Sequence, residues 1–148
     1  MSDEAYRAVF LRVHPTGKMV LSLTTDSDGR EGEYAQLVAR DLGVPPLDVK
    51  VVPADTNRFG NGHGFNTSPS DGVPAAIAST TAKIRDKAQL LAGMALDAPP
   101  ESLTWDNGAW ASGDEYKTIE DIALYAHGTG PLPPGVEGGL DAQTVYRD

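Results

Sequence analysis

A chain of 148 residues is long enough to form one domain whose hydrophobic core needs neither disulfides nor metals for stability. It carries 21 acidic and 12 scattered basic side chains, a formal net charge of −9, which excludes a nucleic-acid or anionic-membrane surface because such surfaces need clustered cations. The sequence has no cysteine and no apolar run of about 18 residues, which excludes thiolate chemistry and a transmembrane helix, so we expect a cytoplasmic protein.

The first part of the sequence alternates strands with one amphipathic helix. Residues 8–14 and 19–25 alternate apolar and polar side chains, which predicts a hairpin of two half-buried strands. Residues 31–42 repeat apolar side chains at helical spacing, and Gly43 follows them as a typical C-terminal helix residue. Residues 49–52, with three valines and one lysine, predict a short third strand before a long polar loop.

A hydroxyl-rich stretch at residues 66–72 precedes the longest predicted helix, residues 75–94. Pro74 suits this position because proline is tolerated near a helix start. One interpretation is an anion site, since free backbone N–H groups and the positive end of the helix dipole face the loop. The other interpretation is that Ser70 or Asp71 only caps the helix. The sequence leaves both open.

A second hairpin follows this helix. Residues 103–105 and 109–111 flank an Asp-Asn-Gly turn at residues 106–108, which is a strong hairpin signal. Trp105 and Trp110 stand on either side of this turn, where we expect them to form a cross-strand contact in the core rather than a ligand platform.

The C-terminal part begins with a capped helix and then changes composition. Thr118 and Asp121 have the spacing of a capping box, which predicts a helix with an apolar side from residue 119. Residues 128–139 are rich in glycine and proline and predict an extended arm. Residues 143–146 are strand-like, and we expect them to find no partner strand in the chain.

The predicted order is strand-strand-helix-strand-helix-strand-strand-helix. This order predicts an α+β fold of two layers, a mixed sheet with helices packed on one face. We expect residues 1–127 to form the domain and residues 128–148 to form a C-terminal Gly/Pro-rich arm.

Few other residues suggest chemistry. The spacing of the three histidines does not suggest a zinc site, and we expect turn or surface positions for each of them, His14, His63 and His127. Of the three, only His63 lies just before the hydroxyl-rich stretch, where it could contact a ligand bound there. An acidic group of Asp28, Glu31 and Glu33 has two interpretations, a divalent-cation site or a solvated helix start. We favour the helix start.

Four motifs follow one another in an order that resembles the molybdopterin-binding large subunit of the xanthine dehydrogenase/aldehyde oxidase family of molybdenum hydroxylases. These motifs are residues 34–45, 49–57, 66–69 and 132–142. Each motif alone is weak, but their succession covers nearly the whole chain and is fairly specific. The resemblance implies the fold of the molybdenum cofactor-binding domain.

The resemblance also implies cofactor-binding residues. The family loop that wraps the pterin corresponds here to Asn66, Thr67, Ser68 and Ser70, whose hydroxyls would bind phosphate or pterin oxygens. A second family contact is a Gly-Gln-Gly turn after the second strand, whose glutamine reaches the metal end of the pterin. Here the turn contains Asp28 and Gly29, so a carboxylate replaces the amide donor near an anionic cofactor.

In the family, the catalytic general base is a glutamate in a later segment. We expect this chain to lack that segment and the cofactor-binding half that precedes it in the full subunit. The resemblance therefore assigns neither a catalytic residue nor a metal ligand to the chain, which we expect to be incomplete as an enzyme on its own.

Two functions stay open. In the first, the chain contacts the cofactor within a split, multi-subunit molybdenum hydroxylase that oxidatively hydroxylates an aldehyde or an N-heterocycle. Its partners would be the remaining molybdenum-subunit segments, an Fe–S subunit and a FAD subunit. The cofactor would be molybdopterin with molybdenum, with a cytosine dinucleotide form as one alternative. In the second, it is a non-catalytic binding or assembly protein that keeps the fold without the cofactor.

Overall fold

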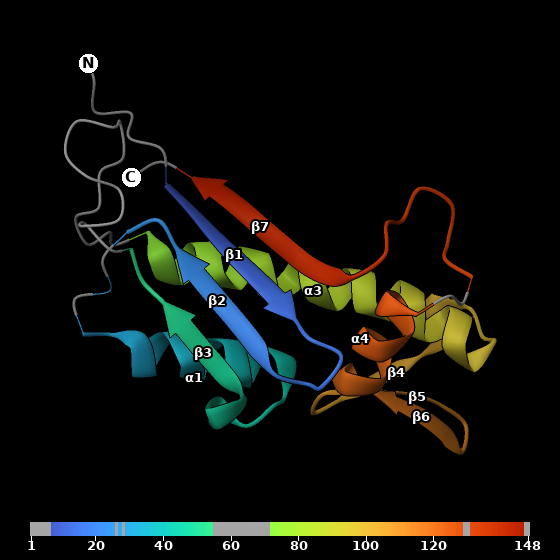
Figure 1. Cartoon of the computed structure of the whole chain (residues 1–148). Coiled ribbons are helices and arrows are strands. Elements are labelled where there is room, and N and C mark those ends of the chain that lie inside the picture. The colour runs from blue at the N-terminus through green and yellow to red at the C-terminus, as the bar shows by residue number, and fades with distance from the viewer. Residues whose placement is uncertain (1–6, 26, 28, 55–71, 129–130, 147–148) are drawn as a thin grey trace.

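A computed structural model describes residues 7–25, 27, 29–54, 72–128 and 131–146 of the chain. Within these residues, four strands form a mixed sheet in the order β3-β2-β1-β7 (Figure 1). β1 pairs antiparallel with β2 and with β7, and β2 pairs parallel with β3. The strands of this main sheet are β1 (Arg7–Val13), β2 (Met19–Leu23), β3 (Val49–Val52) and β7 (Leu140–Tyr146).

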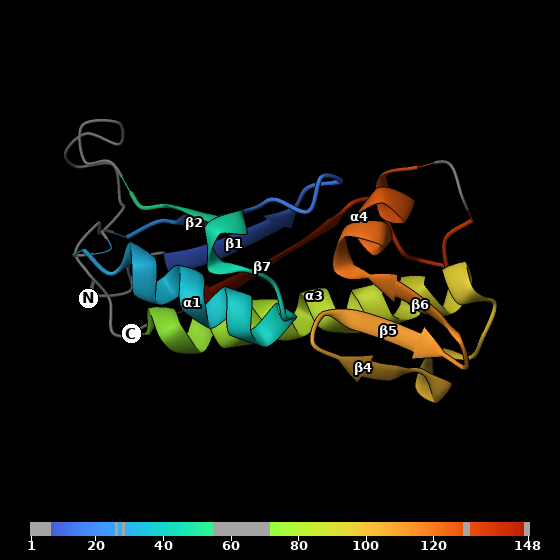
Figure 2. The same cartoon turned by 90° about the horizontal axis from the view of Figure 1, so that it is seen from below.

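Two helices, α1 (Glu31–Leu42) and α3 (Val73–Leu96), cover one face of the main sheet (Figure 2). The strands alternate as expected, so one side of each strand is buried beneath these helices. The buried strand residues include Val9, Leu11, Val13, Met19, Leu21 and Leu23. None of the helices in the described ranges is long and apolar enough to cross a membrane.

The described residues also form a second, antiparallel sheet, β4-β5-β6, beside the C-terminal half of α3 (Figure 2). Its strands are β4 (Thr104–Asp106), β5 (Ala109–Ser112) and β6 (Glu115–Thr118), and α4 (Ile119–His127) follows them. Short 3-10 helices, η1 (Pro46–Asp48) and η2 (Pro100–Ser102), precede β3 and β4. Asn107 and Gly108 both have positive φ, as a two-residue hairpin turn requires.

Two neighbouring threonines of α3 connect the layers. The Thr80 hydroxyl lies 2.7 Å from the Thr144 hydroxyl on β7, and the Thr81 hydroxyl donates to the Asp41 carboxylate of α1 at 2.9 Å. The Lys83 ammonium, one turn further along, donates to the Gln143 carbonyl on β7 at 2.7 Å. α3 is therefore joined by polar contacts to β7, and by Thr81 to α1.

The predicted α+β class, with helices on one face of a mixed sheet, is confirmed. The helix at residues 31–42 and the strand at residues 49–52 have the predicted bounds. The capping box is also present, because the Thr118 hydroxyl accepts from the Asp121 N–H and the Asp121 carboxylate accepts from the Thr118 N–H. The tryptophan contact is confirmed: Trp105 and Trp110 face each other across the hairpin, edge to face, with ring centroids 6.4 Å apart.

The expectation that residues 143–146 lack a partner is wrong. β7 begins at Leu140 and pairs with β1 along its whole length, from Leu140 opposite Val13 to Tyr146 opposite Arg7. The arm before it is also less detached than predicted, because Leu132 and Val136 are partly buried against the core. The sequence also gave no prediction of β6 or of a separate second sheet.

Candidate functional site

The two helices that cover the main sheet, α1 and α3, begin at the same end of it, where β2 and β3 end (Figures 1 and 2). This follows from topology, because β2 and β3 are parallel and joined through α1. A crossover helix runs opposite to the strands that it joins, so it starts where the first strand ends. α3 likewise starts at the end where β3 finishes. We call this end of the sheet, with its two helix N-termini, the β2–β3 end.

The N-terminus of α3 is the better anion site of the two. Its N-cap is Gly72, Pro74 lies in its first turn, and that turn contains no acidic residue. The first N–H groups of a helix have no acceptor within the helix, and the dipole adds positive potential there. The first turn of α1 instead carries Glu31 and Glu33, whose charges offset its dipole.

The turn after β2 is held by local contacts. Ser27 is buried, its hydroxyl donates to the Glu31 carboxylate, and its carbonyl accepts from the Arg30 N–H at 3.0 Å. Gly29 has a φ of +79°, a conformation that glycine adopts without strain. A Cβ at Gly29 would meet no atom of the described residues within 4 Å. Among the described residues, the α-carbon of Gly29 therefore faces open space in a turn that is fixed by local contacts.

Two threonines with different surroundings lead into this turn. The Thr24 hydroxyl accepts from the Ala8 N–H at 2.9 Å, and the Thr24 N–H donates to the Ala8 carbonyl at 3.2 Å. The Thr25 side chain is 1% exposed, and its hydroxyl has no hydrogen-bond partner among the described residues. The Thr25 carbonyl accepts from the Ala54 N–H at 3.0 Å, which continues the contact between β2 and β3. Thr25 therefore has its backbone fixed and its hydroxyl unpaired.

Of the residues predicted to bind the cofactor, Gly29 is described and lies in the turn at the β2–β3 end. The others, Asp28, Asn66, Thr67, Ser68 and Ser70, lie outside the described residues, as does His63. Their assignment stays a prediction. Thr25 was not predicted from the sequence, because no local residue pattern indicates that a hydroxyl will lack a hydrogen-bond partner. Sequence reasoning also missed the meeting of two helix starts, which the strand-helix-strand order would have indicated.

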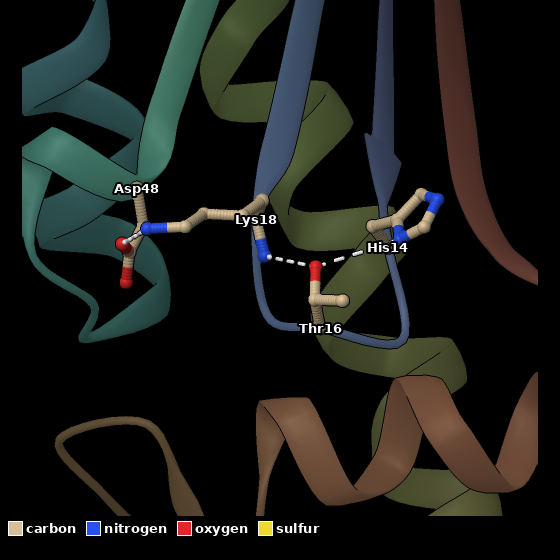
Figure 3. Close-up of polar contacts among 4 residues, drawn as sticks. All are labelled: His14, Thr16, Lys18 and Asp48. Carbon is tan, nitrogen blue, oxygen red and sulfur yellow. Dashed lines mark hydrogen bonds and ion pairs between the residues drawn. The ribbon is translucent and has the colours of Figure 1, made fainter.

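The opposite end of the main sheet carries a polar group that is structural (Figure 3). The Lys18 ammonium contacts the Asp48 carboxylate at 2.6 Å and so joins the β1–β2 turn to η1. The Thr16 hydroxyl lies 3.5 Å from both His14 Nδ1 and the Lys18 N–H. His14 is an exposed turn residue, as predicted, and His127 is an exposed residue in the last turn of α4. The described residues contain no group of three metal-ligating side chains.

Comparison with known proteins gives consistent matches over nearly the whole chain. The family model described as a molybdopterin cofactor-binding domain matches residues 2–148. The carbon monoxide dehydrogenase large chain of Afipia carboxidovorans is 32% identical over 144 residues, which cover 92% of this chain and 17% of that protein. Subunit gamma of the 6-hydroxypseudooxynicotine dehydrogenase complex of Paenarthrobacter nicotinovorans is 28% identical over 81% of this chain and 16% of its own length.

Among solved structures, reconstituted CO dehydrogenase from Oligotropha carboxidovorans superposes with a TM-score of 0.80 at 27% identity. The superposition covers 97% of this chain and 18% of the CO dehydrogenase chain. The chain thus spans about a sixth of the length of the curated relatives that it matches.

Proposed function

The chain belongs to the molybdopterin cofactor-binding domain family, and from this membership we propose that it contacts the pterin cofactor of a molybdenum hydroxylase at its β2–β3 end. The observation that carries the proposal is the meeting of two helix N-termini there, one of which has no acidic residue in its first turn. Molybdopterin carries phosphate, and a helix N-terminus is suited to bind it.

The residues at this end fit such a group. Thr25 supplies a buried hydroxyl that has no partner in the described part of the chain, and the start of α3 supplies backbone N–H groups in a positive potential. Thr67, Ser68 and Ser70 would add hydroxyl donors from the preceding loop, with Asn66 beside them, and Gly29 would allow close approach of the turn. When bound, the cofactor supplies the two-electron redox centre. The chain itself binds and orients it.

The whole enzyme would be a multi-subunit oxidoreductase. The relatives support this, because one is a large chain and another is a subunit of a dehydrogenase complex. We propose that the remaining segments of a molybdenum subunit complete the site and that Fe–S and FAD subunits carry electrons away. The reaction class would be oxidative hydroxylation of an aldehyde or an N-heterocycle by the whole complex, with molybdopterin in its plain or cytosine dinucleotide form.

Native purification from the source organism tests this function. We expect the chain in a large assembly with stoichiometric molybdenum, iron and flavin, determined by native mass and metal analysis. Ser68→Ala should lower the pterin content of that assembly, since a lost hydrogen bond to a charged group costs about 1.5–3 kcal/mol. Ser79→Ala, on the exposed side of α3, is the matched control and should leave it unchanged. A lone, metal-free monomer would contradict the proposal.

A second candidate function is a non-catalytic binding protein that keeps this fold without the cofactor. Acidic charge near the turn favours it, since Glu31 and Glu33 occupy the first turn of α1 and Asp28 replaces an amide. Anions repel an anionic pterin at short range. Asp28→Gln discriminates the two functions. If the wild type binds no pterin and Asp28→Gln binds it, the second function is supported. Strong pterin binding by the wild type would exclude the second function.

A further inference from the structure

We infer that the Thr25 hydroxyl donates a hydrogen bond to an oxygen atom of the bound pterin cofactor. This inference rests on the proposed function and deepens it, because no motif and no family resemblance marked Thr25.

The hydroxyl of Thr25 is buried from solvent and has no hydrogen-bond partner among the described residues. Bulk water therefore does not replace a protein partner.

A buried hydroxyl without a partner is destabilising, so most such groups in folded proteins are paired. Those that stay unpaired in a ligand-free chain are therefore candidates for pairing with a ligand. Thr24 shows the usual arrangement one residue away, because its hydroxyl is paired with the Ala8 backbone on the neighbouring strand. The two adjacent threonines have the same side chain but differ in hydrogen bonding, so the unpaired hydroxyl of Thr25 results from its position and not from its residue type.

The position of Thr25 points to the cofactor. β2 ends at Leu23, and Thr25 follows two residues later, where it is buried and its carbonyl accepts from the Ala54 N–H just after β3. Thr25 therefore lies at the β2–β3 end, the end of the sheet at which α1 and α3 begin. A hydroxyl donor at the end of the sheet where α3 begins adds to the preference of that helix N-terminus for an anionic or carbonyl oxygen.

Burial also has a consequence for binding. A ligand reaches the Thr25 hydroxyl only after the atoms that now cover it move aside, so the contact forms inside the site rather than on its rim. A hydrogen bond that is shielded from water is stronger than an exposed one. Loss of the Thr25 hydroxyl should therefore affect affinity more than loss of a surface hydroxyl.

Substitution of the two threonines tests the inference. Thr25→Val keeps the shape of the side chain and removes the hydroxyl, Thr25→Ser keeps the hydroxyl, and Thr24→Val is the matched control. The full chain is purified natively with the chains bound to it. Melting temperature is measured without cofactor, and affinity is measured by anaerobic dialysis against molybdopterin extracted from a molybdenum hydroxylase, with bound pterin quantified by fluorescence after oxidation.

We expect Thr25→Val to melt a few degrees above the wild type without cofactor, because it removes an unpaired polar group, and to bind the pterin at least about tenfold more weakly. Thr25→Ser should retain the affinity. Thr24→Val should melt below the wild type, because it leaves the Ala8 N–H unpaired, with unchanged affinity.

Two results overturn the inference while leaving the proposed function intact. One is equal pterin affinity of Thr25→Val and the wild type. The other is a lower melting temperature of cofactor-free Thr25→Val, which would show that the hydroxyl stabilises the protein alone. Absence of pterin binding by the wild type would instead overturn the proposed function and the inference together.

Discussion

Two turn glycines bring distant parts of the chain into backbone contact. Gly43 ends α1 with a φ of +69°, and Gly108 lies in the β4–β5 turn with a φ of +90°. A Cβ on Gly43 would lie 2.4 Å from the Asn107 carbonyl carbon and from the Gly108 nitrogen, and a Cβ on Gly108 would lie 2.7 Å from the Gly43 oxygen. Glycine at both positions therefore allows the second hairpin to pack against the end of α1.

Gly43→Ala should lower the free energy of unfolding by at least about 2 kcal/mol, because it adds a clash with backbone atoms to the strain of a left-handed conformation. Gly32→Ala is the control, since a Cβ at Gly32 would meet no described atom within 4 Å. It should raise the free energy of unfolding by up to about 1 kcal/mol, the difference in helix propensity. Urea denaturation of both variants measures the contrast. Equal stabilities would show that the two turns are not in contact.

At the scale of elements, α4 depends on a cap at the junction with β6. β6 ends at Thr118, and the same residue is the N-cap of α4, so the chain changes from strand to helix without a loop. The reciprocal bonds between Thr118 and Asp121 satisfy two N–H groups that the helix leaves free. Ile119 and Ile122 are buried just after the cap, so the cap also sets which face of α4 meets the core.

Thr118→Ala should therefore destabilise the protein by about 1 kcal/mol, since the Asp121 N–H loses its acceptor. Thr118→Ser retains the hydroxyl and should cost much less. Thermal unfolding followed by circular dichroism measures the two variants side by side. If serine and alanine destabilised equally, the methyl group of Thr118 and not the cap would be responsible.

At the scale of the whole molecule, the main sheet has one covered and one open face. Helices α1 and α3 cover one face (Figure 2). The other face carries the exposed side chains of Phe10, Val20 and Val145. Part of this face is hollowed, with a volume of about 560 Å3 between β1, β2 and β7. Arg12 and Asp141, 3.8 Å apart, form an exposed ion pair beside it. Stability should therefore depend strongly on one face and weakly on the other.

A pair of equivalent substitutions tests this asymmetry. Val20→Thr, at a position that is 39% exposed, should change the free energy of unfolding by less than about 0.5 kcal/mol, because the new hydroxyl reaches water. Val9→Thr, at a position that is 0% exposed, should cost about 1–3 kcal/mol, because the hydroxyl is buried among apolar side chains. Chemical denaturation provides both values. A large cost at Val20 would mean that another surface covers this face in the purified protein.

Local signals account for what the sequence predicted well. The bounds of α1 follow from apolar spacing and a C-terminal glycine, the β4–β5 turn from Asn107 and Gly108, and the start of α4 from its capping box. The family resemblance to the large subunit of molybdenum hydroxylases is also confirmed.

Contacts between distant segments account for the errors. Nothing within residues 140–146 indicates that β1 is their partner, since pairing with β1 depends on the free edge left by the first hairpin. The unpaired hydroxyl of Thr25 is likewise a property of its surroundings, and no residue pattern indicates it. At the site, the turn at Gly29 was predicted from resemblance, and the loop residues Thr67, Ser68 and Ser70 lie outside the described residues and stay a prediction.

The pairing of β7 with β1 has a consequence for how the protein folds. β1 is synthesised well before β7, yet Arg7 lies opposite Tyr146 in the finished sheet. One edge of β1 stays without a partner until residues 140–146 have left the ribosome. Pairing of segments so far apart costs chain entropy before any contact compensates for it, which makes it a slow step. From the synthesis of β1 until that of β7, this strand edge is therefore open to association with other chains.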